Sequence, residues 1–71
     1  MDIETIKLLR AASNMNQYEL SEYIGVNRSE LALVEAGYRE PSGRLINAIR
    51  SNFDAEFIRL VEHISELGRS I

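Results

Sequence analysis

The sequence of 71 residues predicts a single all-helical domain built from five short helices. Apolar residues recur three or four positions apart along most of the chain, which is the spacing of one face of an α-helix. Residues that begin helices (Asp, Asn, Ser) precede these apolar stretches, and residues that end helices (Asn, Gly) follow them. At 45% hydrophobic and 27% charged, the composition is that of a globular chain. We therefore expect one all-α domain without linkers or repeats.

The first helix is expected to start at Asp2, a favourable N-cap, and to close at Ser13-Asn14, because asparagine tolerates the left-handed conformation next best after glycine. Asn16 then caps a second helix that begins at Gln17. The residues of the first helix expected to face the core are Ile3, Ile6 and Leu9, with Ala11 or Ala12 in addition.

The centre of the chain, residues 17–35, predicts two short helices that meet at a fixed angle. Gly25 ends the first of them in a left-handed conformation, and Asn27 is a good N-cap for the second. Ser21 is small enough to let the two helices approach closely. The apolar residues that face each other across the turn are Leu20, Ile24, Leu31 and Val34.

A fourth helix is expected after Ser42, and Asn52 can end it. Asp54 caps a fifth helix, which should run to about Leu67 with Gly68 as its left-handed stop. The fourth helix is expected to bury Ile46, Ile49 and Phe53, with Leu45 as a further apolar residue.

These residues resemble the helix-turn-helix of the Cro and phage-repressor (XRE) family, over residues 3–53 and without an insertion or deletion. The matching positions are Arg10, Gln17, Gly25-Val26, Leu31, Val34, Glu35-Ala36-Gly37, Pro41, Ile46, Ile49 and Phe53. The resemblance implies a lambda-repressor-like fold in which residues 1–53 form the four-helix core and residues 54–71 add a C-terminal helix. It also implies a largely buried ion pair between Arg10 and Glu35; the alternative is two solvated side chains.

The resemblance further implies that the outward face of the third helix enters the major groove of double-stranded DNA. The candidate base-reading residues are Arg28, Ser29, Ala32 and Leu33. Arg28 can make a bidentate contact with guanine, whereas Ala32 and Leu33 could only touch thymine methyl groups. Family members commonly carry polar residues at those last two positions. For Leu33 two alternatives stay open: a shielded flank of the core, or an exposed apolar contact for another protein.

Phosphate contacts are expected on both sides of that helix. Asn16 and Gln17 stand at the N-terminus of the second helix, where backbone N–H groups and the helix dipole favour an anion. The resemblance assigns the same role to Gln17. The other phosphate candidates are Asn27, Tyr38, Arg39 and Arg44. Ordinary solvated charge is the alternative for Arg39 and Arg44.

The formal net charge of −3 and the pI near 5.0 are unusual for a protein that binds nucleic acid. Residues 54–71 carry two arginines against four acids, so a basic strip can coexist with an acidic whole. We expect a sequence-specific DNA-binding regulator, repressor-like in its action. The alternative is a protein-interaction module, an antirepressor or modulator whose third helix docks on a protein partner.

The predicted fifth helix carries an apolar stripe wider than a lone small domain needs. Its members are Phe57, Leu60, Val61, Ile64 and Leu67, with Ile71 one turn beyond. This stripe favours a homodimer, which would bind a near-palindromic operator. The alternative is that the whole stripe belongs to the core.

The residues that would carry chemistry are sparse. There is no cysteine and His63 is the single histidine, so we expect neither a metal site nor a cofactor. No nucleophile, base and orienting residue can be combined, so we expect no enzyme. A signal peptide and a membrane-spanning apolar run are both absent, so we expect no membrane partner and a cytoplasmic location.

Overall fold

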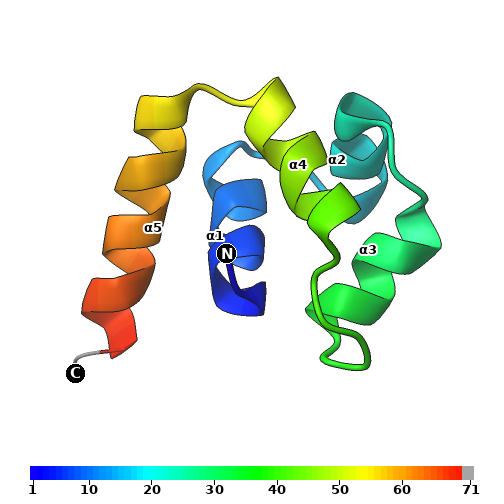
Figure 1. The fold of residues 1–71 in the computed structure, drawn as a ribbon, viewed down its shortest axis with the longest axis horizontal. Helices are drawn as coiled ribbons and strands as arrows, with labels where there is room; N and C mark the ends of the chain where they lie inside the picture. The colour runs from blue at the N-terminus through cyan, green and yellow to red at the C-terminus, as the bar shows by residue number, and fades with distance from the viewer. Residues whose placement is uncertain (70–71) are drawn as a thin grey trace.

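A computed structural model describes residues 1–69, and these residues form five α-helices (Figure 1). The helices are α1 (Ile3–Ala12), α2 (Gln17–Ile24), α3 (Arg28–Glu35), α4 (Gly43–Asn52) and α5 (Ala55–Arg69). No strand occurs among these residues, so the predicted all-α fold class is confirmed. The expectation for Ile71 lies outside the described residues.

Cap side chains begin the first four helices at the residues predicted from the sequence. Asp2, Asn16, Asn27 and Ser42 each accept a hydrogen bond from a backbone N–H in the first turn of the following helix. Asn16 forms a full capping box, because Glu19 also accepts from the Asn16 N–H at 2.9 Å. These bonds satisfy donors that a helix terminus otherwise leaves unpaired.

The last helix begins as predicted but ends later. Asp54 Oδ2 accepts the backbone N–H groups of Glu56 and Phe57 at 3.0 and 3.2 Å. The expected left-handed stop at Gly68 is wrong, because α5 continues through this residue to Arg69. The Arg69 guanidinium pairs with Asp2 across the α1–α5 contact, which favours one more helical residue over a turn at Gly68.

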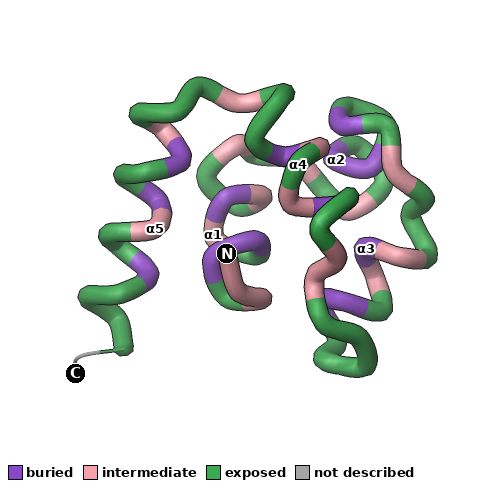
Figure 2. Tube along the Cα trace, in the orientation of Figure 1, coloured by how far each residue is buried: buried purple, intermediate pink, exposed green. Residues whose placement is uncertain are grey.

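One core joins all five helices, and Figure 2 shows its buried residues on their facing sides. Its members are Ile6, Leu9, Leu20, Ile24, Leu31, Val34, Leu45, Ile49, Ile58 and Val61. In α4 the buried pair is Leu45 and Ile49, whereas Ile46 is only partly buried. The face of α4 that contacts the core is therefore rotated by about one residue from the expected face. In α1 both Ala11 and Ala12 are exposed, and the third buried residue is Thr5.

The helices are arranged around α1, which packs against both α3 and α5. The second helix packs against α3 and α4. As a result α3 and α5 lie at opposite ends of the molecule (Figure 1). Within residues 1–69, no helix combines the length and the hydropathy needed to cross a membrane.

Candidate nucleic-acid interface

The turn between α2 and α3 fixes the direction in which α3 projects. Gly25 adopts φ 74° and ψ 34°, a left-handed conformation that suits glycine. Its N–H and that of Val26 both donate to the carbonyl oxygen of Ser21, at 2.9 and 3.0 Å. The buried Ser21 side chain keeps the helices close, and Asn27 then starts α3 by accepting from the Ser29 N–H at 2.8 Å.

The inward residues of α3 determine which side chains face outward. Leu31 and Val34 are fully buried, so the opposite face is presented to solvent. On that face Arg28 and Ser29 are exposed, and Ala32 is partly buried. Leu33 is 39% exposed and is therefore no shielded flank of the core. All four base-reading candidates thus occupy one outward face, which is polar at its N-terminal end and apolar in the middle.

Three arginines lie in α3 and in the two segments that follow it: Arg28 in the first turn of α3, Arg39 in the segment after α3, and Arg44 at the start of α4. All three are exposed, and none forms an ion pair with another of residues 1–69. Tyr38, in the same segment as Arg39, is 83% exposed. The guanidinium groups are therefore available to an external anion.

Glu30 lies in the first turn of α3, beside this face, and carries a negative charge. In the structure Glu30 Oε2 accepts from Ser42 Oγ at 3.1 Å, and the same Ser42 oxygen accepts from the Leu45 N–H. The carboxylate is thereby directed to the start of α4, where it links α3 to α4. No local spacing signals this contact, because the partners are twelve residues apart.

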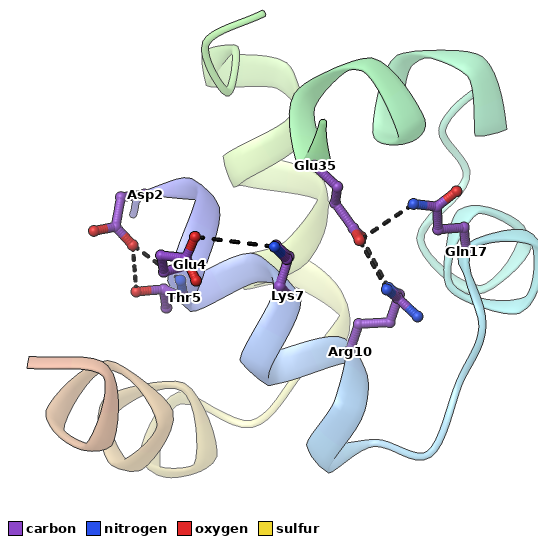
Figure 3. A network of polar contacts seen from close by, with 7 residues as sticks. All are labelled: Asp2, Glu4, Thr5, Lys7, Arg10, Gln17 and Glu35. Atoms are coloured by element: carbon purple, nitrogen blue, oxygen red, sulfur yellow. Dashed lines mark hydrogen bonds and ion pairs between the residues drawn. The ribbon is translucent and has the colours of Figure 1, made fainter. Parts of the chain in front are cut away.

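The expected pair of Arg10 and Glu35 is present as a bidentate contact (Figure 3). Arg10 Nε donates to Glu35 Oε2 at 2.9 Å, and Arg10 Nη2 donates to Glu35 Oε1 at 2.8 Å. The side chain of Glu35 is 4% exposed and that of Arg10 is 24% exposed. The hydrogen bond to Glu35 raises the pKa of Arg10 above its ordinary value, so the guanidinium stays charged.

The N-terminus of α2 carries the remaining phosphate candidates. The side chains of Asn16 and Asn27 are engaged as caps, so their carbonyl oxygens already have partners. Gln17 Nε2 donates to Glu35 Oε1 at 3.2 Å, a contact that the sequence did not indicate. The backbone N–H groups of Gln17 and Tyr18 have no acceptor within the described part of the chain, and they point out of the helix end.

The apolar stripe of α5 divides into a buried and an exposed part. Val61 is 2% exposed and belongs to the core, so its assignment to a dimer interface is wrong. Phe57 is partly buried and stacks on Phe53 with ring centroids 6.0 Å apart. The stripe residues left exposed are Leu60 at 56%, Ile64 at 47% and Leu67 at 53%.

The described residues bring together no set of metal ligands, and a cavity lies outside α3. Among residues 1–69, no three His, Cys, Asp or Glu side chains are placed so that they could hold a metal ion. A cavity of about 490 Å³ lies between the start of α1 and the end of α5, and it is lined by Asp2, Thr5 and Arg69 among others. None of its lining residues belongs to α3.

Comparison with known protein families places the helix-turn-helix segment in a family. A model of the helix-turn-helix family HTH_3 matches residues 6–57, which is more than half of the chain and includes α2, the turn and α3. Searches of curated proteins and of solved structures found no significant match. The matched segment also contains the three exposed arginines of α3 and the two segments that follow it, and the pair of Arg10 and Glu35. The chain therefore belongs to the XRE-type helix-turn-helix family HTH_3, and it is a DNA-binding helix-turn-helix regulator.

Proposed function

We propose that the chain is a sequence-specific transcriptional regulator that acts as a repressor by occupying an operator. The observation that carries this proposal is the exposed face of α3, together with the three unpaired arginines of α3 and the two segments that follow it. Arg28 at the start of α3 reads guanine, and Ser29 contacts a neighbouring base edge. Ala32 and Leu33 contact thymine methyl groups, and Leu33 contributes the larger apolar surface of the two.

Phosphate contacts position this helix in the groove. Gln17 and the unpaired N–H groups at the start of α2 bind one backbone phosphate, and Arg39, Arg44 and Tyr38 bind phosphates on the other side. Most of the acidic net charge lies away from this site: residues 54–71 contribute −2 of the net −3, with four acids and two arginines in and before α5, at the end of the molecule away from α3 (Figure 1). The molecule is 32 Å along its longest axis. Charges separated by more than about 8 Å are largely screened at physiological salt.

The test compares three arginine variants on a duplex selected from a random DNA pool. Arg28→Ala should cost about 1–3 kcal/mol and relax the preference at one base pair. Arg44→Ala should weaken binding to all sequences alike and lower the salt slope by about 0.9 for each phosphate that is no longer neutralised. Arg59→Ala, an exposed arginine of α5, is the matched control and should change neither quantity. Equal losses of affinity for all three variants, or no selected sequence, would refute the proposal.

The regulator is further proposed to act as a homodimer on a near-palindromic operator. Leu60, Ile64 and Leu67 follow one another at helical spacing along α5, and all three are exposed. A second copy of the same helix would cover this apolar strip in a two-fold arrangement. The strip faces away from the core residues of α5, so pairing leaves the domain intact.

Sedimentation of the full chain over a range of concentrations tests the dimer. Ile64→Asp should yield a folded monomer, because an unpaired polar group in an apolar interface costs about 1–3 kcal/mol and a charged group costs more. Asn47→Asp adds the same charge at an exposed position of α4 and should leave the dimer unchanged. A wild-type chain that stays monomeric at high concentration would contradict this part of the proposal.

A second candidate function is a protein-interaction module whose α3 docks on a partner protein. The observation in its favour is the exposed apolar side chain of Leu33 in the middle of α3, in a chain of net charge −3. This alternative predicts no DNA binding even at low salt. It also predicts a salt-insensitive protein complex that Leu33→Gln abolishes and Arg28→Ala leaves unchanged, the reverse of the result expected for a DNA-reading helix.

A further inference from the structure

Gln17 brings the proposed phosphate contact and the buried ion pair into one network. Its Nε2 donates to Glu35 Oε1 at 3.2 Å, and the same oxygen accepts from Arg10 Nη2 at 2.8 Å (Figure 3). Gln17 is the first residue of α2, Glu35 the last of α3, and Arg10 lies near the end of α1. The network therefore joins three helices at the point where α2 begins.

The chemistry of the carboxylate determines how the Gln17 amide is oriented. An ionised carboxylate only accepts hydrogen bonds, so the NH₂ end of the amide must face Glu35. One Nε2 hydrogen then points at Glu35, and the planar geometry of the amide directs the second hydrogen elsewhere. Gln17 is only partly buried, so this second hydrogen lies close to solvent at the start of α2. The unpaired backbone N–H groups of Gln17 and Tyr18 are at the same helix end.

The positive charge of Arg10 allows the Glu35 carboxylate to lie close to the proposed phosphate contact. A lone Glu35 would repel a DNA phosphate, but the bidentate contact with Arg10 compensates its charge. Arg10 is itself fixed by a third bond, from Nη1 to the carbonyl oxygen of Met15 at 3.1 Å. The ion pair thus has no net charge, and the bonds of Arg10 hold the Glu35 carboxylate that accepts from Gln17.

We propose that Glu35 is a positioning residue for DNA binding, which holds the Gln17 amide so that its second Nε2 hydrogen is directed to a backbone phosphate. This inference rests on the phosphate contact proposed above for Gln17. A free glutamine side chain would have to lose rotamer freedom when DNA binds, whereas a side chain already held by Glu35 has lost most of it before binding. Glu35 itself does not touch the DNA.

The test measures how much Gln17 contributes with and without its acceptor. The two backgrounds are the wild-type chain and Arg10→Met/Glu35→Leu, in which an apolar pair replaces the ion pair. The readout is the Kd for a random-sequence duplex, because phosphate contacts are sequence-independent. In the wild type Gln17→Ala should raise the Kd about tenfold without changing its salt slope, since a neutral amide releases no counterion. In the apolar background it should raise the Kd less than about twofold.

Two results would overturn the inference in different ways. An equal rise of the Kd in both backgrounds would show that Gln17 binds phosphate without help from Glu35. No rise in the wild type would show that Gln17 makes no phosphate contact, and this part of the proposed function would then be wrong as well. Asn47→Ala, an exposed amide on α4, is the control and should change the Kd in neither background.

NMR of the wild-type chain gives a second readout that needs no variant. The two Nε2 protons of a glutamine give separate signals because rotation about the amide C–N bond is slow, and in Gln17 the proton bound to Glu35 should exchange with water more slowly than the other. On addition of the duplex, the signal of the proton facing Glu35 should stay in place and the other should move. Equal exchange rates of the two protons with water, or no movement of either signal, would contradict the positioning role.

Discussion

Breaking the pair of Arg10 and Glu35 should destabilise the fold unequally, depending on which partner is removed. Arg10→Met leaves the carboxylate of Glu35 without its two guanidinium bonds in a site where only 4% of the side chain is exposed. Removing one partner of a buried pair costs about 3–5 kcal/mol. Glu35→Leu should cost less, because Arg10 is 24% exposed and can turn its charge to water. A chain of this length has roughly 4–10 kcal/mol of stability in total, so Arg10→Met removes a large part of it.

The double variant measures the interaction itself. Arg10→Met/Glu35→Leu replaces the charges by apolar side chains of similar volume, which is often neutral for a buried pair. We therefore expect it to be more stable than Arg10→Met alone, with a coupling energy above about 1 kcal/mol. Urea unfolding followed by circular dichroism gives all four stabilities. If the two single losses of stability simply add in the double variant, the pair contributes no mutual stabilisation and the reasoning is refuted.

Three further predictions test the fold by urea unfolding. Gly25→Ala should cost about 1–2 kcal/mol because φ at this residue is +74°; an added Cβ would meet no atom within 4 Å, so the cost comes from the backbone alone. Gly43 is equally open but has no positive φ, so Gly43→Ala is the control and should not destabilise the fold. Ile49→Ala should cost about 2–5 kcal/mol and Ile46→Ala clearly less, since only Ile49 is fully buried; equal losses would contradict the observed face of α4. Hydrogen bonds from Thr5 lower the pKa of Asp2, so its contribution is complete above about pH 3.9 and is lost as the pH falls through the lowered pKa. In the Asp2→Asn variant the free energy of unfolding should therefore decrease less as the pH falls through this range.

Local chemistry explains why the helix boundaries could be predicted. An N-cap depends on a side chain and a backbone N–H two or three residues away, and Asp2, Asn16 and Asn27 all make such bonds. The left-handed residues Asn14 and Gly25 are equally local. At Gly68 the same reasoning failed, because a tertiary ion pair between Arg69 and Asp2 holds the last turn of α5.

What could not be predicted depends on contacts between distant residues. Leu45 and Ile46 both stand at helical spacing to Ile49, and only the position of α4 against α2 decides which of them is buried. Val61 and Leu60 are adjacent in one apolar stripe, yet α1 covers the first and leaves the second exposed. For the candidate site, the ion pair came from the family resemblance, and the bonds of Gln17 to Glu35 and of Glu30 to Ser42 had no sequence signal.

The contact between Thr5 and Ser65 favours one register of α5 along α1. Their hydroxyl oxygens lie 3.1 Å apart in a buried site, sixty residues apart in sequence. If α5 slid by one turn, the hydrogen bond between the two hydroxyl groups would be lost, at about 1 kcal/mol. Thr5 Oγ1 would keep its contact with Asp2 Oδ1 at 2.7 Å, and Ser65 Oγ its contact with Arg69 Nη2 at 3.2 Å. A slip of about 5.4 Å would also move the exposed strip of α5 relative to α3. In the proposed dimer the strip would shift in both copies, which would change the distance between the two α3 helices. Successive major grooves on one face of DNA are about 34 Å apart, and the two α3 helices have to match this spacing. Two small hydroxyl groups far from the DNA would then help to determine which distance between operator half-sites the protein accepts.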